Sequence, residues 1–211
     1  MNYGLIPNFG LKDTPITEDM ILRSAAEVTE EVHKWDSFVN VPDDQGNTGT
    51  CGARAEAGRA EVLINAAHGE DVFLGETQLD AIAIYIRAHE MRHPGKSVNF
   101  LSGLTLGDSV DACIELGIYP RDASVSRIEV LPLELFEALK KGPLTYGLNV
   151  HNGWRSISPL TGEIPSAPAL SVAGHAVLGI GLNIGVDGII LPTFVNSWHH
   201  SWGWNGMAQM A

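Results

Sequence analysis

Hydrophobic and polar positions divide the chain into a helical first part and an extended second part. Up to about residue 141, apolar residues recur at three- and four-residue spacing, which is typical of amphipathic helices. We expect one helix capped by Thr17 and further helices over about 51–68, 77–93, 107–116 and 132–141. After residue 142 the pattern predicts strands over 144–150, 176–182 and 189–195. Helices followed by strands favour an α+β fold with two lobes.

The last two predicted strands read as a hairpin around the turn at 183–188. If the strands pair symmetrically about that turn, His175 lies directly opposite Asn196. Cross-strand neighbours of this kind have Cβ atoms about 5 Å apart. The amide oxygen of Asn196 can then accept the N–H of one imidazole nitrogen, which leaves the other nitrogen to take a proton from a nucleophile.

A candidate nucleophile stands earlier in the chain, in Gln45-Gly-Asn-Thr-Gly-Thr-Cys51. This glycine-rich loop delivers Cys51 to the start of the helix predicted over 51–68, where Thr50 is placed to cap it. Backbone N–H groups and the helix dipole favour a thiolate there, so we expect a lowered pKa for Cys51. Cys113 instead shares a helical face with Val110 and Ile114, which predicts a core residue.

Three segments, in this order along the chain, resemble the motifs of the papain-like cysteine peptidases. They are Gln45-Gly-x-x-Gly-x-Cys51, then Gly174-His175-Ala-Val, then Asn196-Ser-Trp198-x-x-x-Trp202-Gly. His175 and Asn196 follow Cys51 by 124 and 145 residues, close to the separation of about 130–150 that is usual in this family.

The resemblance implies a papain-like two-lobed α+β fold with the active-site cleft between the lobes. Residues 45–125 would form a helical lobe that carries Cys51, and residues 126–211 an antiparallel β lobe that carries His175 and Asn196. Residues 1–44 would pack on both lobes. Because the stretch before Gln45 is too short for the family's inhibitory propeptide, we expect a form without one.

The resemblance also implies a role for each site residue. Cys51 would be the nucleophile, His175 the base and then the acid, and Asn196 the residue that orients the imidazole. The Gln45 side chain and the Cys51 N–H would hold the oxyanion. Four further residues would lie beside the substrate, where Trp198 would also shield the His–Asn pair from water: Gly49, Gly174, Trp198 and Trp202.

The chain departs from the family pattern at several places around the expected cleft. Gly52 replaces an aromatic residue after the nucleophile, and His199 and Ser201 replace glycines after Trp198, so we expect a narrower wall there. No paired glycines that would bind a substrate backbone are recognisable between Cys51 and Ser102.

A competing motif, His89-Glu90-Met-Arg-His93, matches the H-E-x-x-H pattern of zinc peptidases. On a helix this spacing puts both imidazoles on one face. Arg92 would bring a positive charge beside the metal, however, and no third ligand stands at a familiar spacing. We therefore expect an amphipathic helix with a core face of Leu79, Ile82 and Ile86, and neither a metal nor another cofactor.

Composition narrows the partners and the compartment. The chain has 25 Asp and Glu against 13 Lys and Arg, a net charge of −12, which disfavours nucleic acid and anionic lipid surfaces. It has no apolar run of about 18 residues that would span a membrane and no signal-peptide pattern. Its two cysteines suit a reducing environment, so we expect a cytoplasmic protein.

The expected function is a cysteine endopeptidase that cleaves peptide or protein substrates through a thioester. Two alternatives from other classes remain open at this point. One is a binding module that keeps the papain fold without activity. The other is an acyltransferase or amidase on the same triad, because the residues that select water over another nucleophile lie outside the motifs. A zinc peptidase is a remote third.

Overall fold

The structure is a computed structural model that describes residues 18–69, 73, 78–123, 131–164 and 173–210. Thr17, the expected cap of the first helix, lies outside this range. The helices are α1 (Glu18–Ala26), α2 (Cys51–His68), α3 (Ala81–Arg92), α4 (Leu106–Glu115) and α5 (Pro132–Lys141), with short 3-10 helices at Asp36–Phe38 and Asn152–Ser156. The strands are β1 (Leu144–Val150), β2 (Ala173–Ile184), β3 (Ile190–Val195) and β4 (Met207–Gln209).

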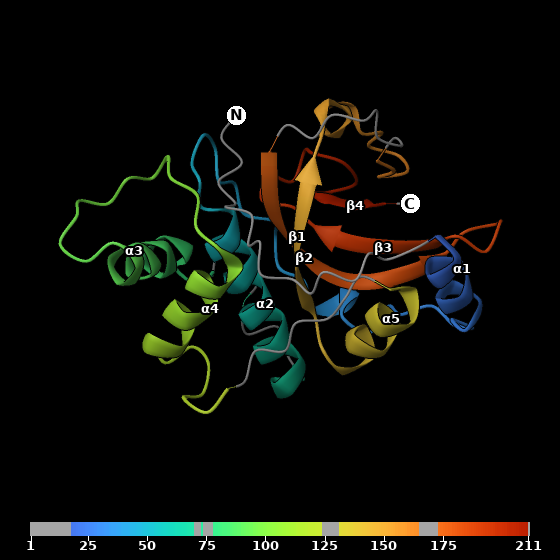
Figure 1. The fold of residues 1–211 in the computed structure, drawn as a ribbon, viewed down its shortest axis with the longest axis horizontal. Helices are drawn as coiled ribbons and strands as arrows, with labels where there is room; N and C mark the ends of the chain where they lie inside the picture. The colour runs from blue at the N-terminus through green and yellow to red at the C-terminus, as the bar shows by residue number, and fades with distance from the viewer. Residues whose placement is uncertain (1–17, 70–72, 74–77, 124–130, 165–172, 211) are drawn as a thin grey trace.

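The first lobe consists of α2, α3 and α4, which stand together on one side of the molecule in Figure 1. Helix α3 begins where the Asp80 side chain accepts from the N–H groups of Ile82 and Ala83. Helix α4 begins with a capping box between Thr105 and Asp108. The core between the three helices includes Cys113, which is fully buried as predicted.

The core face of α3 differs from the expected one. Its buried residues are Ala81, Ile84, Tyr85, Ala88 and His89, whereas Ile82 and Ile86 are only half-buried. The prediction failed because the short apolar stretch Ala-Ile-Ala-Ile-Tyr-Ile offers two helical phases of similar hydrophobicity. The Tyr85 hydroxyl, which donates to the Asn99 and Ser102 carbonyls at 2.7 Å each, selects the other phase.

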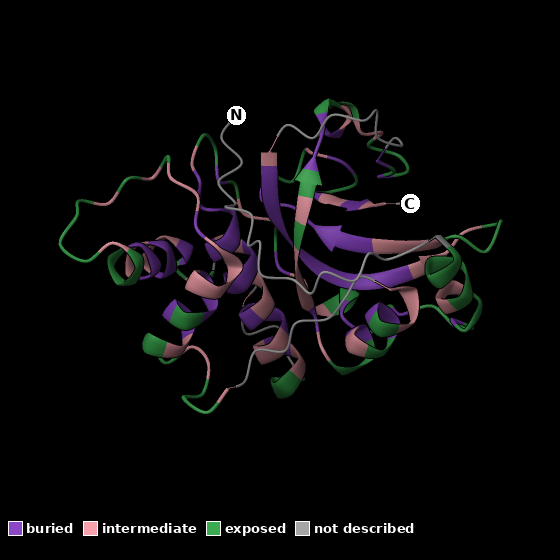
Figure 2. Ribbon diagram, viewed as in Figure 1, coloured by how far each residue is buried: buried purple, intermediate pink, exposed green. Residues whose placement is uncertain are grey.

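The second lobe is an antiparallel sheet with strand order β1-β2-β3-β4. Helices α1 and α5 pack together beside it, and α5 shares a core with Leu182 of β2. Trp154 and Phe194 stack at 5.5 Å in a separate aromatic core of this lobe. Strand β2 is buried along most of its length (Figure 2) because β1 and β3 flank it and α2 packs on it.

Helix α2 joins the two lobes because small residues allow it to lie close to β2. A Cβ placed on Gly58 would stand 3.2 Å from the Leu178 side chain, and Ala55 packs against Ala176. The contact fixes the start of α2 against the middle of the sheet. It thereby brings the Cys51 loop of the first lobe to the β2 segment that carries His175.

The register of the β2–β3 hairpin corrects the symmetric pairing expected from the sequence. Leu178 pairs with Val195 and Ile184 with Ile190, with a register shift between Gly179 and Gly181. The strand partner of His175 is Leu148 of β1, so His175 does not lie directly opposite Asn196. The difference begins at the turn, where the Gly185 N–H donates to the Ile189 carbonyl at 2.8 Å, so the turn is centred further along the chain than the symmetric pairing assumed.

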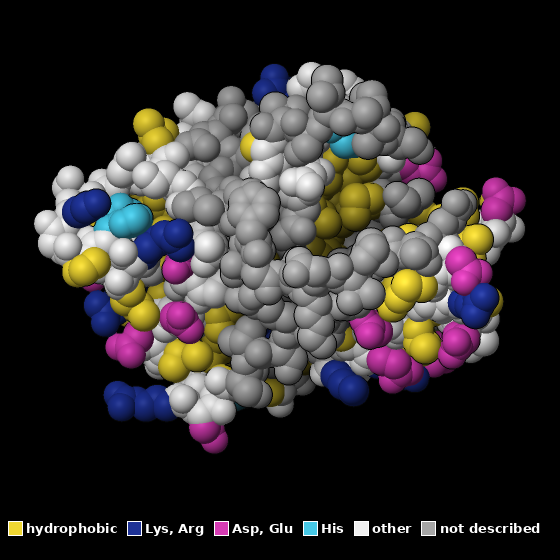
Figure 3. Space-filling model, in the orientation of Figure 1, with side chains coloured by type: hydrophobic (Ala, Val, Ile, Leu, Met, Phe, Trp, Pro, Cys, Tyr) yellow, Lys and Arg dark blue, Asp and Glu magenta, His cyan; other side chains and the backbone are white. Residues whose placement is uncertain are grey.

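Acidic side chains dominate part of the surface, as the net charge of −12 requires. On the face shown in Figure 3, Asp and Glu gather over α1 and α5, with a few Lys and Arg among them. Within the described residues, no helix is both long and apolar enough to cross a membrane.

Candidate active site

Cys51 is the first residue of α2, and its side chain is buried at the boundary between the lobes, 1% exposed. Its sulfur accepts hydrogen bonds from the backbone N–H groups of Cys51, Gly52 and Ala176. The first two belong to the open turn at the start of α2. The third belongs to β2, directly after His175, so the thiol lies against the backbone beside that histidine.

His175 and Asn196 form a buried pair. The Nε2–H of His175 donates to the Asn196 Oδ1 at 2.7 Å, and their side chains are 0% and 1% exposed. The two side chains meet although their strand positions are not directly paired, because diagonal neighbours across a sheet are also within reach. A neutral imidazole with the proton on Nε2 has Nδ1 as its basic nitrogen, which is the state that a proton acceptor requires.

The backbone around Asn196 holds its amide in place. The Asn196 N–H donates to the Gly206 carbonyl at 2.8 Å, and the Ser197 N–H donates to the Asn196 Oδ1 at 2.9 Å. Oδ1 therefore accepts from both His175 and Ser197. This fixes the amide with its oxygen toward the imidazole.

Two tryptophans enclose the imidazole. The Trp198 ring lies 4.8 Å from the His175 ring, centroid to centroid, and Trp154 stands edge-on to it at 6.2 Å. Trp202 packs on Trp198 at 5.5 Å and donates its Nε1–H to the Trp154 carbonyl at 2.8 Å. Trp198 therefore covers the His–Asn pair, and Trp202 supports it from the aromatic core. No sequence signal pointed to Trp154.

Gln45 is buried and held at both ends of its amide. Its Oε1 accepts from the Ser197 hydroxyl at 2.6 Å, and its Nε2 donates to the Thr48 carbonyl at 2.7 Å. The backbone N–H of Gln45 also donates to the Ser197 carbonyl at 2.9 Å. Ser197 thus links the Gln45 loop of one lobe to the Asn196 segment of the other, a role that the sequence alone did not reveal.

The loop between Gln45 and Cys51 depends on a close backbone approach at Gly49. The Gly49 N–H donates to the Phe100 carbonyl at 2.7 Å, and a Cβ on Gly49 would stand 2.4 Å from the Ser102 carbonyl oxygen. Only glycine fits there. The 99–103 segment, in which no paired glycines were found, therefore lies directly beside the nucleophile loop.

Thr50 occupies the N-cap position of α2, but it does not cap the helix through its side chain. Its hydroxyl instead bonds the Thr48 hydroxyl at 2.8 Å and accepts from Arg54 Nε at 3.1 Å. The expected capping bond is therefore wrong. The N–H groups at the start of the helix face the Cys51 sulfur instead.

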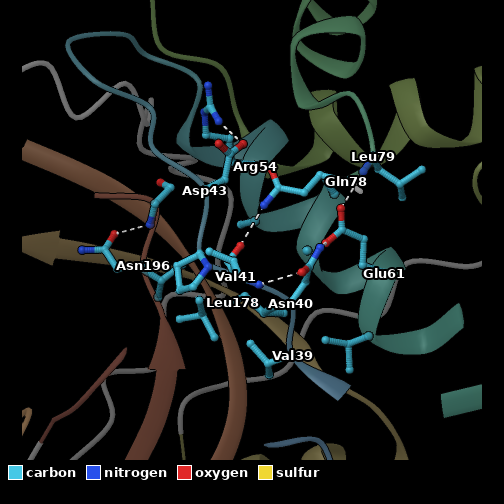
Figure 4. A pocket seen from close by; sticks show the side chains of 18 of the residues that line it. Val39, Asn40, Val41, Asp43, Arg54, Glu61, Gln78, Leu79, Leu178 and Asn196 are labelled. Carbon is cyan, nitrogen blue, oxygen red and sulfur yellow. Dashed lines mark hydrogen bonds and ion pairs between the residues drawn. The ribbon is translucent and has the colours of Figure 1, made fainter. Parts of the chain in front are cut away.

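Residues 39–45, which we call the strap, contact both the helical lobe and the β lobe. Figure 4 shows Asp43 beside Arg54 and Gln78 beside Val41. Arg54 of α2 forms an ion pair with Asp43, and the Gln78 amide donates to the Val41 carbonyl at 2.8 Å. A cavity of about 50 Å³ lies between the strap, α2 and β2, which gives room for water molecules only.

The structure contradicts the lowered pKa that the sequence predicted for Cys51. Burial raises the pKa of the Cys51 thiol to about 11, although the N–H groups of Ala176, Gly52 and Cys51 lower it in part. The expectation of a lowered pKa considered the helix start and the imidazole, and it did not include desolvation, which favours the neutral thiol. In this structure, burial therefore favours the thiol form of Cys51 over the thiolate.

The H-E-x-x-H segment lies on α3 in the helical lobe. His89 is 3% exposed and packs near Tyr85, and its ring is 5.0 Å from that of His93. Arg92 pairs with Asp108 at 2.6 Å. Among the described residues, no group of three His, Cys, Asp or Glu side chains is placed to hold a metal ion.

Comparison with known proteins gives a clear fold and no close relative. No family model and no curated protein sequence matches the chain. Xylellain, a cysteine protease from Xylella fastidiosa, superposes with a TM-score of 0.72 at 22% identity, over 99% of this chain and 89% of that one.

Two further solved structures agree. The bromelain protease from Ananas comosus, solved with the E64 inhibitor, has a TM-score of 0.59 at 18% identity, over 87% of this chain and 90% of that one. Procathepsin L2 from Tenebrio molitor larval midgut has a TM-score of 0.62 at 18% identity, over 100% of this chain and 72% of that one. The chain therefore has the papain-like cysteine protease fold, and the predicted two-lobed α+β class is confirmed.

Proposed function

We propose that the protein is a cysteine endopeptidase that hydrolyses peptide bonds of peptide or protein substrates with Cys51, His175 and Asn196. The observation that carries the proposal is the buried hydrogen bond from His175 Nε2 to Asn196 Oδ1, directly beside the Cys51 sulfur. A thiol, a base and an amide that orients the base are the parts of a thiol hydrolase. The three cysteine proteases of the same fold support the same reading.

The mechanism follows from these positions. When a substrate carbonyl lies against Cys51, His175 Nδ1 takes the thiol proton and the sulfur attacks the carbonyl carbon. The resulting oxyanion accepts hydrogen bonds from the Cys51 N–H and the Gln45 side-chain amide. The imidazolium then gives its proton to the leaving amine, the C–N bond breaks, and a thioester remains. A water molecule, deprotonated by His175, releases the acid and restores the thiol.

We assign the surrounding residues to substrate binding and support. Gly49 and Gly174 would lie against the substrate backbone, on either side of the substrate carbonyl that reacts. Trp198 would close the cleft over His175. Trp202 acts through Trp198. We propose lobes of 45–125 and 126–211, with 18–44, the described part of the expected N-terminal segment 1–44, packed on both. Two free cysteines suit a cytoplasmic compartment.

The burial of Cys51 favours one alternative, a papain-fold binding module without turnover. Covalent labelling of Cys51 by a thiol-directed epoxide, followed by mass spectrometry, separates an enzyme from an inactive module. Turnover of a peptide library with and without added amines then separates a hydrolase from an acyltransferase or amidase.

The decisive test compares two cysteine variants on that library. Cys51→Ala should abolish cleavage, while Cys113→Ser, in the core of the helical lobe, should retain it. A metal chelator should leave cleavage unchanged. Full activity in Cys51→Ala would end the proposal, and loss of activity with the chelator would restore the zinc alternative.

A further inference from the structure

A second pocket, of about 210 Å³, lies at the β4 edge of the sheet. Its walls come from the ends of β2 and β3, from β4, and from two loops that carry Leu160 and Trp204. None of its lining residues belongs to the proposed catalytic site. Pockets for drug-sized ligands measure about 300–1,000 Å³, so this one suits a single ring of a larger molecule.

A chain of side-chain amides fixes the polar part of the pocket. The Asn183 Nδ2 donates to Thr193 Oγ1 at 3.2 Å and to Gln209 Oε1 at 2.9 Å. These bonds orient both amides, with Asn183 Oδ1 as a remaining acceptor and Gln209 Nε2 as a remaining donor. Because Thr193 Oγ1 accepts from Asn183, its own O–H is a second donor. No bond among the described residues occupies the Asn183 Oδ1 or the Gln209 Nε2.

The rest of the pocket is apolar and unusually exposed. Trp204 is 52% exposed and Leu160 is 89% exposed. The Trp204 backbone is fixed by hydrogen bonds to and from Met207 at 2.9 and 3.0 Å. A tryptophan in contact with water beside oriented polar groups is typical of a binding surface, because the ring provides a large contact area with few rotatable bonds.

The pocket offers no charge to a ligand. Its lining contains no Asp, Glu, Lys or Arg, and the chain as a whole carries a net charge of −12. An anion would meet a repulsive field without a local cation, and a cation would find no carboxylate in the pocket. The ligand is therefore uncharged, with an apolar ring surface for Trp204 and polar groups on one edge.

We propose that this pocket binds one ring of an uncharged saccharide. A sugar ring has an apolar C–H surface that packs on an indole, and its neighbouring hydroxyls each donate and accept. Two such hydroxyls on one edge match the acceptor of Asn183 and the donors of Gln209 and Thr193. A peptide group matches less well, because its N–H and C=O point in opposite directions and it has no ring surface.

The test is calorimetric titration of the whole chain with three uncharged probes: maltohexaose, cellohexaose and chitohexaose. At least one should bind with a Kd in the millimolar range, as expected for a single ring. Trp204→Ala should weaken that binding by about tenfold or more. Val186→Ala, a fully exposed side chain in the hairpin turn outside the pocket, should leave it unchanged.

A second variant keeps the proposal testable if Trp204→Ala does not fold. Gln209→Glu retains the oxygen that accepts from Asn183 and replaces only the Nε2 donor, so binding should fall while thermal unfolding stays near that of the unchanged chain. Absence of binding to all three probes, binding by both pocket variants as tight as that of the unchanged chain, or binding of hexaglycine in place of the saccharides would overturn the proposal. Peptidase activity enters none of these readouts, so the outcome is independent of the proposed function.

Discussion

At the scale of single residues, two opposing effects act on Cys51. The start of α2 and the Ala176 N–H stabilise a negative sulfur, while burial of the side chain disfavours it. Burial prevails and raises the pKa to about 11. In the proposed mechanism, the thiol therefore becomes a nucleophile only when His175 takes its proton, and the His175–Asn196 bond would keep Nδ1 as the accepting nitrogen.

This predicts the pH dependence of Cys51 alkylation. A raised pKa keeps the thiol protonated near neutrality, so its reaction rate with iodoacetamide should still be rising above about pH 10, where an ordinary thiol with a pKa of about 8.5 has levelled off. The rate is measured in Cys113→Ser, which leaves Cys51 as the single thiol. A rate that reaches its plateau below pH 7 would instead indicate a preformed thiolate–imidazolium pair.

A second prediction concerns Ser197, which acts on Gln45 and does not touch the reacting atoms. Its hydroxyl donates to the Gln45 Oε1 at 2.6 Å, which would keep the amide nitrogen toward the proposed oxyanion site. Ser197→Ala should lower kcat by about tenfold with KM nearly unchanged, because the interaction lost is made in the transition state. Ser197→Thr, which keeps the hydroxyl, should restore most of kcat. A rise in KM alone would contradict this role.

Gln45 itself should be more sensitive. Gln45→Ala removes the side-chain donor and should lower kcat by about 100-fold or more. Gln45→Glu should be worse, because its carboxylate would repel the oxyanion. Wild-type kcat in both variants, measured on the same peptide, would show that the loop does not form the oxyanion hole.

At the scale of elements, local patterns predicted most helices and strands, and long-range contacts decided the rest. The strand predicted over 144–150 has the observed bounds of β1, and α2 has those of the predicted 51–68 helix. The hairpin register was wrong because the turn closes at Gly185 and Ile189, further along the chain than the symmetric pairing assumed. A long-range contact also forms on β2, where Val32, far away in sequence, exchanges two backbone hydrogen bonds of 2.9 Å with Leu182. That chain crosses β2 close to Gly181, where a Cβ would stand 2.7 Å from the Val32 carbonyl oxygen. No local signal encodes this contact.

The packing of the nucleophile loop gives an element-scale prediction. Gly49→Ala would push a methyl group into the Ser102 carbonyl and should destabilise the protein by about 1–3 kcal/mol, as overpacking does. Gly142→Ala is the matched control, because that position is extended and has no atom within 4 Å of the added methyl. Urea unfolding measures both. Equal stability of the two variants would mean that the loop and the 99–103 segment are not in contact.

At the scale of the whole molecule, the strap contacts both lobes. Asp43 pairs with Arg54 of the helical lobe, and the neighbouring Asp44 forms a strand bridge with Trp198 of the β lobe. The motif residues of the site could be named from the sequence because their spacing is distinctive. The strap contacts could not, since Asn40, Asp43 and Arg54 belong to no motif and meet only in the folded chain.

Glu61, which accepts a hydrogen bond from the strap, gives a testable prediction about how stability depends on pH. It is 5% exposed, its Oε1 accepts from the Leu79 N–H at 2.6 Å, and Asn40 of the strap donates to its Oε2 at 3.4 Å. Burial raises the pKa of Glu61 above its ordinary value, and these two hydrogen bonds offset the effect only in part. The folded protein therefore holds a proton on Glu61 at a pH where the unfolded chain has already lost it.

The sign of the pH dependence follows from this difference. Below the unfolded pKa of about 4.3 both states are protonated, and the stability that Glu61 contributes is fully present. As the pH rises through the raised folded pKa, that contribution is lost. Glu61→Gln does not titrate, so the unfolding free energy of the unchanged chain minus that of the variant should decrease from about pH 4 to pH 8. Glu90→Gln on the exposed side of α3 controls for the loss of one negative charge. A difference that increases with pH would show that the strap and Leu79 stabilise the ionised carboxylate more than burial disfavours it.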